Sequence, residues 1–456
     1  MDQAAAYLDE HLERHIDELK EFLRIPSVSA LSEHRRDVTT AAAWLVDYLK
    51  RVGFESARLI ETGGHPIVYA ERFDAPGAPT ALIYGHYDVQ PVDPLPLWTS
   101  PPFEPDVREG RLYARGASDD KGQLIMHLQA LEALLRTRGR LPVNVKLLVE
   151  GEEEIGSPSL DPFVRERREM LAADAVVISD TSMFAEGMPT ICVGLRGIAC
   201  LEVHVRGARS DLHSGLYGGA APNAVHLLVE LLASMREGQG RILVPGFYDS
   251  VEELEPDERA AIRALPFDEV AFAAQLGVRE LVGEPGYTAL ERISTRPTLE
   301  INGIWGGFQG EGTKTVIPAE AHAKITCRLV PNQDPKEVQR RIAEHLRRVA
   351  PASAQVEVEL GHAARPWKCS PKHPVIQAGV RALEKSFGRS VALVRMGGSI
   401  PVVEAFDASL GAPIVLMGFA SPHSNAHAPN EFFPLETFAV GRKALAAYWD
   451  ELAKGA

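Results

Sequence analysis

Cysteine is scarce in this chain, and hydrophobic runs are short. Among 456 residues only four are cysteine, and no two of them have CxxC spacing: Cys192, Cys200, Cys327 and Cys369. Such isolated cysteines favour buried thiols over metal ligands or disulfides, and they predict a cytoplasmic protein. No stretch approaches the roughly 18 consecutive apolar residues of a membrane-spanning helix, so no membrane partner is expected.

Basic residues are in the minority. The chain has 48 lysines and arginines against 62 aspartates and glutamates, a formal net charge of −14. Because no basic field is available to attract phosphates, nucleic acids and anionic membranes are poor partners. The first 23 residues lack the basic start and apolar block of a signal peptide, and their apolar residues recur at helical spacing.

Helical and strand patterns alternate along the first 190 residues. We expect helices at 1–23, 39–54 and 120–139, and strands at 65–73, 78–88, 143–154 and 173–180. Short apolar strands between helices are typical of a sheet covered on both faces. The sequence therefore predicts a three-layer α/β/α domain.

A different pattern begins near residue 196. Alternating strands are expected at 198–207, 298–307, 321–330 and 356–360, and helices at 223–237 and 334–350, whereas residues 237–300 give no clear prediction. These elements predict an α+β domain inserted at 196–370. The first pattern resumes at about residue 371, so residues 1–195 and 371–456 are expected to form one discontinuous catalytic domain.

Acidic and histidine residues follow several predicted strands, where open α/β sheets bind ligands. His86 and Asp88 project to the same side of an extended chain, which suits a metal-bound histidine oriented by a carboxylate. A histidine in a polar turn has the same pattern. Asp119 and Asp120 precede a helix, where a carboxylate either caps the helix or bridges two metal ions about 3.5–4 Å apart.

Four acids lie within residues 150–154, and a charge run of this kind is usually a solvated loop. Alternatively, cations offset the repulsion, with one glutamate bound to metal and its neighbour acting as a general base. Asp180 ends a further strand, and the loop at 422–431 offers His423 and His427. Two histidines and three carboxylates are the mixture that a dinuclear zinc hydrolase needs, with cobalt or manganese as alternatives.

Six motifs occur in the order GHYD, GASDDKG, EGEEEIGS, ISD, SDLHSG and NAHAPNE. In this order they resemble the di-zinc aminoacylase and carnosinase peptidases. The segments DLHSGLYGG, CRLVPNQ and GGSIP are most similar to the branch of carnosinases and cytosolic nonspecific dipeptidases. The resemblance implies a zinc-peptidase catalytic domain and an inserted lid domain that forms a homodimer.

The resemblance also implies the ligands of two divalent metal ions, Zn²⁺ first, with Mn²⁺ or Co²⁺ as alternatives. Asp119 would bridge the two metals. His86 and Asp180 would complete one site, and Glu154 and His427 the other.

The remaining catalytic roles follow by the same resemblance. Glu153 would be the general base, with Glu152 as its rival because three consecutive glutamates leave the register open. Asp88 would orient His86, and the Asp119–Asp120 peptide would be cis.

The inserted domain supplies the expected substrate contacts. By resemblance, His213 reaches the active site of the partner subunit and stabilises the oxyanion, and Arg328 grips the substrate's C-terminal carboxylate. Thr315, His362 and Ser399 match supporting substrate contacts in the same branch.

These roles imply metal-dependent hydrolysis of the peptide bond of dipeptides. The sequence has neither GxSxG nor a catalytic-cysteine signature, so no covalent nucleophile is expected. N-acyl-amino-acid deacylases and carboxypeptidase G-like enzymes share the metal machinery and remain alternatives. A metal-free scaffold relative would have lost a ligand or the base, and all of these residues are present.

Overall fold

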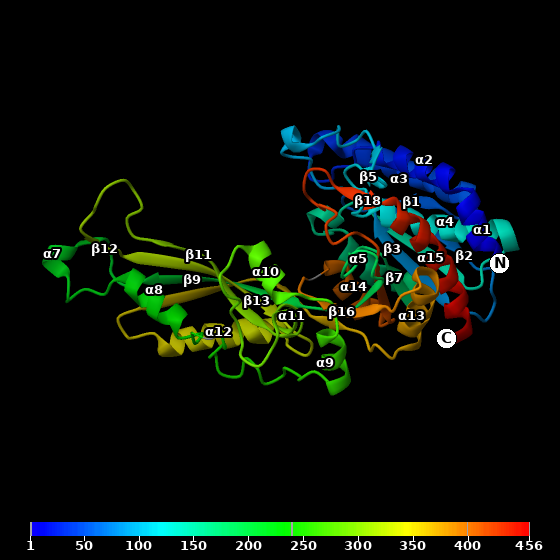
Figure 1. The fold of residues 1–456 in the computed structure, drawn as a ribbon. Coiled ribbons are helices and arrows are strands. Elements are labelled where there is room, and N and C mark those ends of the chain that lie inside the picture. Colours follow the sequence, from blue (N-terminus) through cyan, green and yellow to red (C-terminus); the bar gives the residue numbers. More distant parts are fainter. Residues whose placement is uncertain (1, 239, 399, 456) are drawn as a thin grey trace. The chain divides into compact units, whose positions relative to one another are not determined.

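The structure is a computed structural model that describes residues 2–238, 240–398 and 400–455. It contains two compact units (Figure 1). The first unit covers residues 2–193, 369–394 and 401–455, and the second covers residues 194–368, 395–398 and 400.

A mixed sheet forms the centre of the first unit, with the strand order β1-β2-β6-β3-β7-β17-β8. The middle strands β6, β3, β7 and β17 are parallel, whereas β1, β2 and β8 pair antiparallel with their neighbours. β16 pairs with β8. The bounds are β1 (Arg58–Ile60), β2 (Ile67–Arg72), β3 (Thr80–His86), β6 (Asn144–Glu150), β7 (Ala175–Ile178), β8 (Thr190–Leu195), β16 (Ala392–Met396) and β17 (Ile414–Gly418).

Helices cover both faces of this sheet (Figure 1). One layer consists of α1 (Gln3–Glu10), α2 (Leu12–Leu23), α3 (Arg35–Val52), α4 (Lys121–Arg138), α13 (Pro374–Phe387) and α15 (Leu435–Gly455). Ile83 and Val177 join the core of this layer. On the opposite face, the ring of Tyr84 meets Phe406 of α14 edge-on at 5.5 Å. That layer consists of α14 (Pro401–Leu410), α5 (Leu160–Glu166) and α6 (Arg168–Leu171). The predicted three-layer α/β/α architecture is confirmed.

Helix α4 is buried from Lys121 to Leu134, because it is covered by neighbours along most of its length. Its first residue follows Asp120 directly, so the packed helix fixes the start of the loop before it. A small sheet, ordered β18-β5-β4, lies near the other end of that loop. Its strands are β4 (Asp106–Arg108), β5 (Arg111–Tyr113) and β18 (Phe432–Pro434).

The second unit is built on an antiparallel sheet with the order β11-β13-β9-β14. Burial alternates along β9 and β13, as expected for a sheet with one covered face. Buried residues of α8 and α12 pack on that face. The elements are β9 (Gly197–Arg206), β11 (Thr298–Gly306), β13 (Glu320–Leu329), β14 (Gln355–Ala364), α8 (Ala224–Ala233) and α12 (Pro335–Val349).

The other elements of the second unit are short. They are β10 (Leu212–His213), α7 (Ser214–Tyr217), α9 (Pro256–Arg263), α10 (Glu269–Leu276), α11 (Ala289–Thr295), β12 (Val316–Ile317) and β15 (Trp367–Lys368). Three single-turn 3-10 helices lie in the first unit: η1 (Ser32–His34), η2 (Leu95–Leu97) and η3 (Glu153–Ile155).

Several sequence predictions need correction. The single helix expected at 1–23 is two helices that meet at His11. The segment 237–300, which gave no clear prediction, holds α9, α10 and α11. None of the four cysteines forms a disulfide, but only Cys192 and Cys327 are buried; Cys200 and Cys369 are partly exposed. Among the described helices, none is both long and apolar enough to cross a bilayer.

Candidate metal centre

The predicted site residues of the first unit meet at one edge of its sheet. Strands β3 and β6 are parallel, and their last residues, His86 and Glu150, are direct neighbours. Strand β7 lies on the other side of β3 and ends two residues before Asp180. Carboxyl ends of parallel strands share one edge, so three separate motifs converge there.

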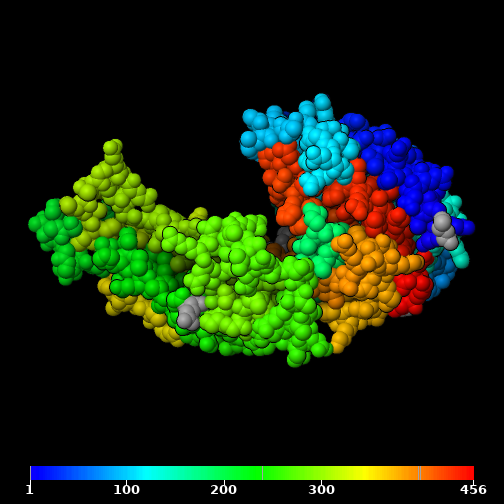
Figure 2. Space-filling view, viewed as in Figure 1, coloured from blue at the N-terminus to red at the C-terminus, as the bar shows by residue number. Residues whose placement is uncertain are grey.

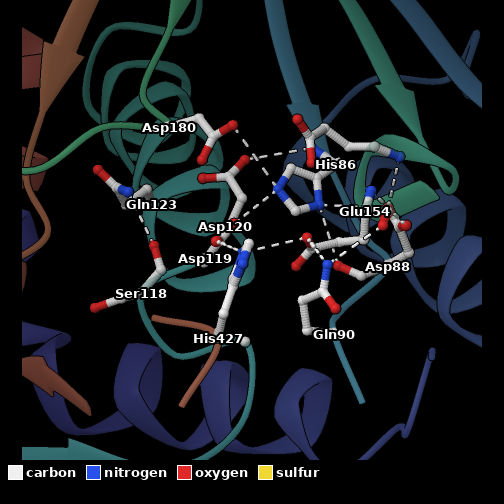
Figure 3. A network of polar contacts seen from close by, with 12 residues as sticks. His86, Asp88, Gln90, Ser118, Asp119, Asp120, Gln123, Glu154, Asp180 and His427 are labelled. Carbon is white, nitrogen blue, oxygen red and sulfur yellow. Dashed lines mark hydrogen bonds and ion pairs between the residues drawn. The ribbon is translucent and has the colours of Figure 1, made fainter. Parts of the chain in front are cut away.

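The Asp119 carboxylate lies between two imidazoles (Figure 3). One oxygen, Oδ1, is 3.0 Å from Nε2 of His86, and the other, Oδ2, is 2.8 Å from Nε2 of His427. The Asp119–Asp120 peptide is cis, as the resemblance implied. Each oxygen of Asp119 therefore faces a different histidine, which is the disposition of a carboxylate shared by two sites.

A second carboxylate lies beside each imidazole. Asp180 Oδ2 is 3.9 Å from Nε2 of His86, and Glu154 Oε2 is 3.2 Å from Nε2 of His427. Two groups result, His86–Asp119–Asp180 and Asp119–Glu154–His427, and the potential ligand atoms within each lie within 4.8 Å of one another. One imidazole with two carboxylates is a donor set that suits Zn²⁺, Co²⁺ or Mn²⁺.

A third cluster of this kind in the described chain is His15, Glu18 and Glu132. There, Arg14 Nη2 donates to Glu132 Oε1 at 3.0 Å, and Arg442 Nη1 lies 2.5 Å from His15 Nδ1. Two guanidinium groups already occupy this cluster, so it is a structural ion network rather than a metal site.

Asp88 connects His86 to the glutamate segment. His86 Nδ1 lies 3.1 Å from the Asp88 carbonyl oxygen and 3.3 Å from its Oδ1. The Asp88 carboxylate also accepts the backbone N–H groups of Glu153 at 3.3 Å and Glu154 at 3.1 Å. Asp88 therefore fixes both the histidine ring and the turn that carries the two glutamates.

The three consecutive glutamates have different surroundings. Glu152 is buried, and its carboxylate accepts the backbone N–H groups of His65 at 2.8 Å and Ser159 at 3.1 Å. Glu154 lies beside His427. Glu153, between them, is partly exposed, and the charges of Glu154, Asp119 and Asp88 act on it. Both oxygens of Glu152 are engaged by backbone, which favours Glu153 as the base.

The site stabilises positive charge. Burial raises the pKa of Glu153 to about 7, with repulsion from neighbouring carboxylates adding to the effect. Burial and the charges of Asp119 and Asp120 raise the pKa of Asp180 well above its usual range. Hydrogen bonds to Asp119 and Glu154 raise the pKa of His427 to about 10. A divalent cation would supply the same positive charge without protons, so the residues present fit a metal.

Sequence reasoning did not find Gln90. Its Nε2 donates to Glu154 Oε2 at 2.8 Å and orients that carboxylate. The contact joins residues 64 positions apart, and a lone glutamine two residues after Asp88 carries no periodic or motif signal of its own.

The other predicted residues lie in the second unit. His213 ends β10 and is exposed, and its Nδ1 accepts the N–H of Gly215 at 3.0 Å. The Thr315 carbonyl accepts the N–H of Ser214 at 3.1 Å, so the structure brings these segments together. Arg328 is half-buried on β13, and His362 is exposed at the irregularity of β14. Ser399 lies outside the described residues.

The fold and this ligand chemistry are those of a metal-dependent hydrolase. A model of Peptidase family M20/M25/M40 matches residues 82–451, and the chain belongs to this family of metallopeptidases. The resemblance inferred from the six motifs is thereby confirmed.

Relatives cover nearly the whole chain. The Cys-Gly metallodipeptidase dug1 of Schizosaccharomyces pombe is 33% identical over 99% of this chain and 98% of its own length. The Beta-Ala-His dipeptidase of Homo sapiens is 30% identical over 100% of this chain and 93% of its own length. The crystal structure of the M20 family metallo-carboxypeptidase Sso-CP2 from Sulfolobus solfataricus has a TM-score of 0.80 and 34% identity, covering 96% of this chain and 99% of that one.

Proposed function

We propose that this chain is a broad-specificity dipeptidase that hydrolyses the peptide bond with two divalent metal ions in its first unit. The observation that carries the proposal is Asp119, whose two oxygens face His86 and His427 at 3.0 and 2.8 Å. Asp180 would complete one metal site and Glu154 the other. Zn²⁺ is the proposed metal, with Mn²⁺ or Co²⁺ as alternatives.

Two ions bound there would lower the pKa of a water molecule between them and polarise the scissile carbonyl. In the proposed reaction, Glu153 removes a proton from this water and later delivers it to the leaving amine. Asp88 and Gln90 hold the ring of His86 and the carboxylate of Glu154 in place.

The second unit is proposed to contribute the substrate contacts and a dimer interface. Nδ1 of His213 accepts a hydrogen bond, so the proton of the neutral ring lies on Nε2, which can donate to an oxyanion of the partner's substrate. Arg328 would bind the substrate's C-terminal carboxylate, with Thr315, His362 and Ser399 as further contacts. We place the homodimer in the cytoplasm, consistent with four cysteines that form no disulfide.

The alternative activities are an N-acyl-amino-acid deacylase and a carboxypeptidase. The likeness to a metallo-carboxypeptidase at 34% identity favours the latter over the former. Dipeptidase is preferred because the Schizosaccharomyces pombe and human relatives, which match this chain over nearly their whole length, are named dipeptidases.

One experiment separates these activities. The protein is stripped of metal, reconstituted with Zn²⁺ or Mn²⁺, and given one dipeptide in two forms, free and N-acetylated, while amine release is measured. We expect strong preference for the free dipeptide and no turnover without metal. Preference for the acetylated form would overturn the dipeptidase assignment and leave the metal site standing. Equal turnover after complete metal removal would overturn both.

A further inference from the structure

Glu431 is a buried acid that belongs neither to the ligands nor to the base. Its exposed fraction is 0%, and its carboxylate accepts four N–H bonds. Oε2 accepts from Arg115 Nη1 at 2.6 Å and from the backbone of Gly116 at 2.9 Å. Oε1 accepts from the backbone of Ser118 at 2.8 Å and of Asp119 at 3.1 Å.

All four donors lie within residues 115–119, in the loop that precedes α4. Fixing the N–H groups at Gly116, Ser118 and Asp119 fixes the path of this loop, and Ser118 Oγ also donates to the Phe432 carbonyl at 2.7 Å. The other side of Asp119 is held by the buried helix α4. The backbone of Asp119 is therefore fixed on both sides, by the hydrogen bonds to Glu431 before it and by helix α4 after it. This sets the direction of the Asp119 side chain.

Glu431 also ends the loop that carries His427. Asn425, His427 and Asn430 in this loop all have positive φ, of 55°, 61° and 62°. A positive φ is uncommon outside glycine, although asparagine and histidine adopt it more readily than other residues. Directly after Glu431, the pairing of β18 with β5 fixes the end of this loop.

Asn430, the neighbour of Glu431, connects the same loop to residues 97–99. It accepts from Thr99 and donates to the Leu97 carbonyl, both at 2.8 Å. In the space-filling view, the light-blue segment that contains Leu97 and Thr99 lies against the orange-red loop that carries His427 (Figure 2).

From these contacts we propose that Glu431 is a positioning residue that locks the loop of Asp119 to the loop of His427 and so presets the spacing of the two metal sites. The proposal rests on the proposed function, because it assigns Glu431 a role through the metal ligands. This role requires a carboxylate. All four of its partners are donors, so a glutamine amide in its place would direct its own N–H₂ group at two of them.

The test is metal binding to the metal-free protein, measured by calorimetric titration with Zn²⁺ for wild type, Glu431→Gln and Glu436→Gln. Glu436 is exposed five residues further on, so its substitution is a matched change of charge. We expect wild type and Glu436→Gln to bind two ions. We expect Glu431→Gln to bind at least one of them about 10- to 100-fold more weakly. The absorption spectrum of bound Co²⁺ should shift in the same variant, because the ligand geometry changes.

Unchanged affinities and Co²⁺ spectrum in folded Glu431→Gln would overturn the role of Glu431 alone. Fewer than two ions in wild type would overturn the proposed function instead. If Glu431→Gln does not fold, Glu431→Asp replaces it, since it keeps the charge and shortens the reach. Weaker metal binding by folded Glu431→Asp supports the proposal, and wild-type affinity contradicts it.

Discussion

At the residue scale, side chains of one type have different partners because the backbone directs them to different places. Glu152, Glu153 and Glu154 are consecutive. The first binds backbone N–H groups, the third faces His427 and the second has the pKa that burial raises to about 7. Composition therefore cannot identify the base, whereas the hydrogen-bond partners of its neighbours can.

Replacing Glu153 with glutamine should separate chemistry from metal binding. The amide keeps the size of the side chain but cannot remove a proton from water. We therefore expect kcat to fall by at least about 10²- to 10⁴-fold while two ions remain bound. Steady-state kinetics with metal analysis of the same sample checks this.

Glu152→Gln is the matched control for that experiment. It disturbs the hydrogen bonds that Glu152 accepts from His65 and Ser159. We therefore expect it to lower the free energy of unfolding and to change kcat much less than Glu153→Gln does. If Glu152→Gln were the variant that keeps metal and loses hydrolysis, the assignment of the base would be wrong by one residue.

Some of the site residues could be predicted from the sequence, and others could not. The acids and histidines at strand ends could be selected from the sequence, because strand ends are where α/β sheets bind ligands. Their individual roles came from resemblance and remain predictions. Gln90 and the contacts of Glu431 could not be found, since each joins segments 64 or more positions apart and depends on the fold.

At the scale of elements, periodicity predicted the long helices and buried strands, and it failed where elements are short. β4, β5 and β18 have three residues each, too few to show an alternation. Yet these strands fix the loop between His427 and α15. The break at His11 was hidden too, since apolar spacing continues across it.

Helices α2, α4 and α15 meet at the buried network around Glu132. His15 Nε2 lies 3.2 Å from Glu132 Oε2, and Arg14 donates to the other oxygen. Burial raises the pKa of Glu132, but the hydrogen bond of His15 and the charge of Arg14 outweigh it and lower the pKa to about 2. The carboxylate thus prefers its charged form more strongly in the folded state than in the unfolded state.

This pKa predicts a pH-dependent stability. The contribution of Glu132 is fully present above its ordinary pKa of 4.5 and is lost as the pH falls toward 2. The difference in unfolding free energy between wild type and Glu132→Gln should narrow by about 2 kcal/mol from pH 6 to pH 3. Urea unfolding at each pH measures it. Glu13→Gln, an exposed change on α2, should show no such narrowing, and a constant gap for Glu132→Gln would contradict the prediction.

At the scale of the whole molecule, the two units carry different parts of the proposed reaction. All proposed metal ligands lie in the first unit, whereas His213 and Arg328 lie in the second. Under the proposal, the first unit alone accounts for metal binding and water activation but not for substrate selection. The assignment of a catalytic and a dimerisation domain is a prediction that variants of the second unit can test.

His213→Ala should lose turnover and keep both metals. Loss of one oxyanion donor typically costs about 10²- to 10³-fold in kcat. Equal loss of metal would contradict the oxyanion role.

Mixing variants tests whether His213 acts on the partner subunit. Glu153→Gln and His213→Ala are each inactive alone under the proposal. In a mixed dimer, the subunit with intact Glu153 receives intact His213 from its partner, so one site works. Random exchange makes half of the dimers mixed, and activity should recover to about a quarter of wild type. If His213 served its own subunit, every site in the mixture would lack one group, and no activity would return.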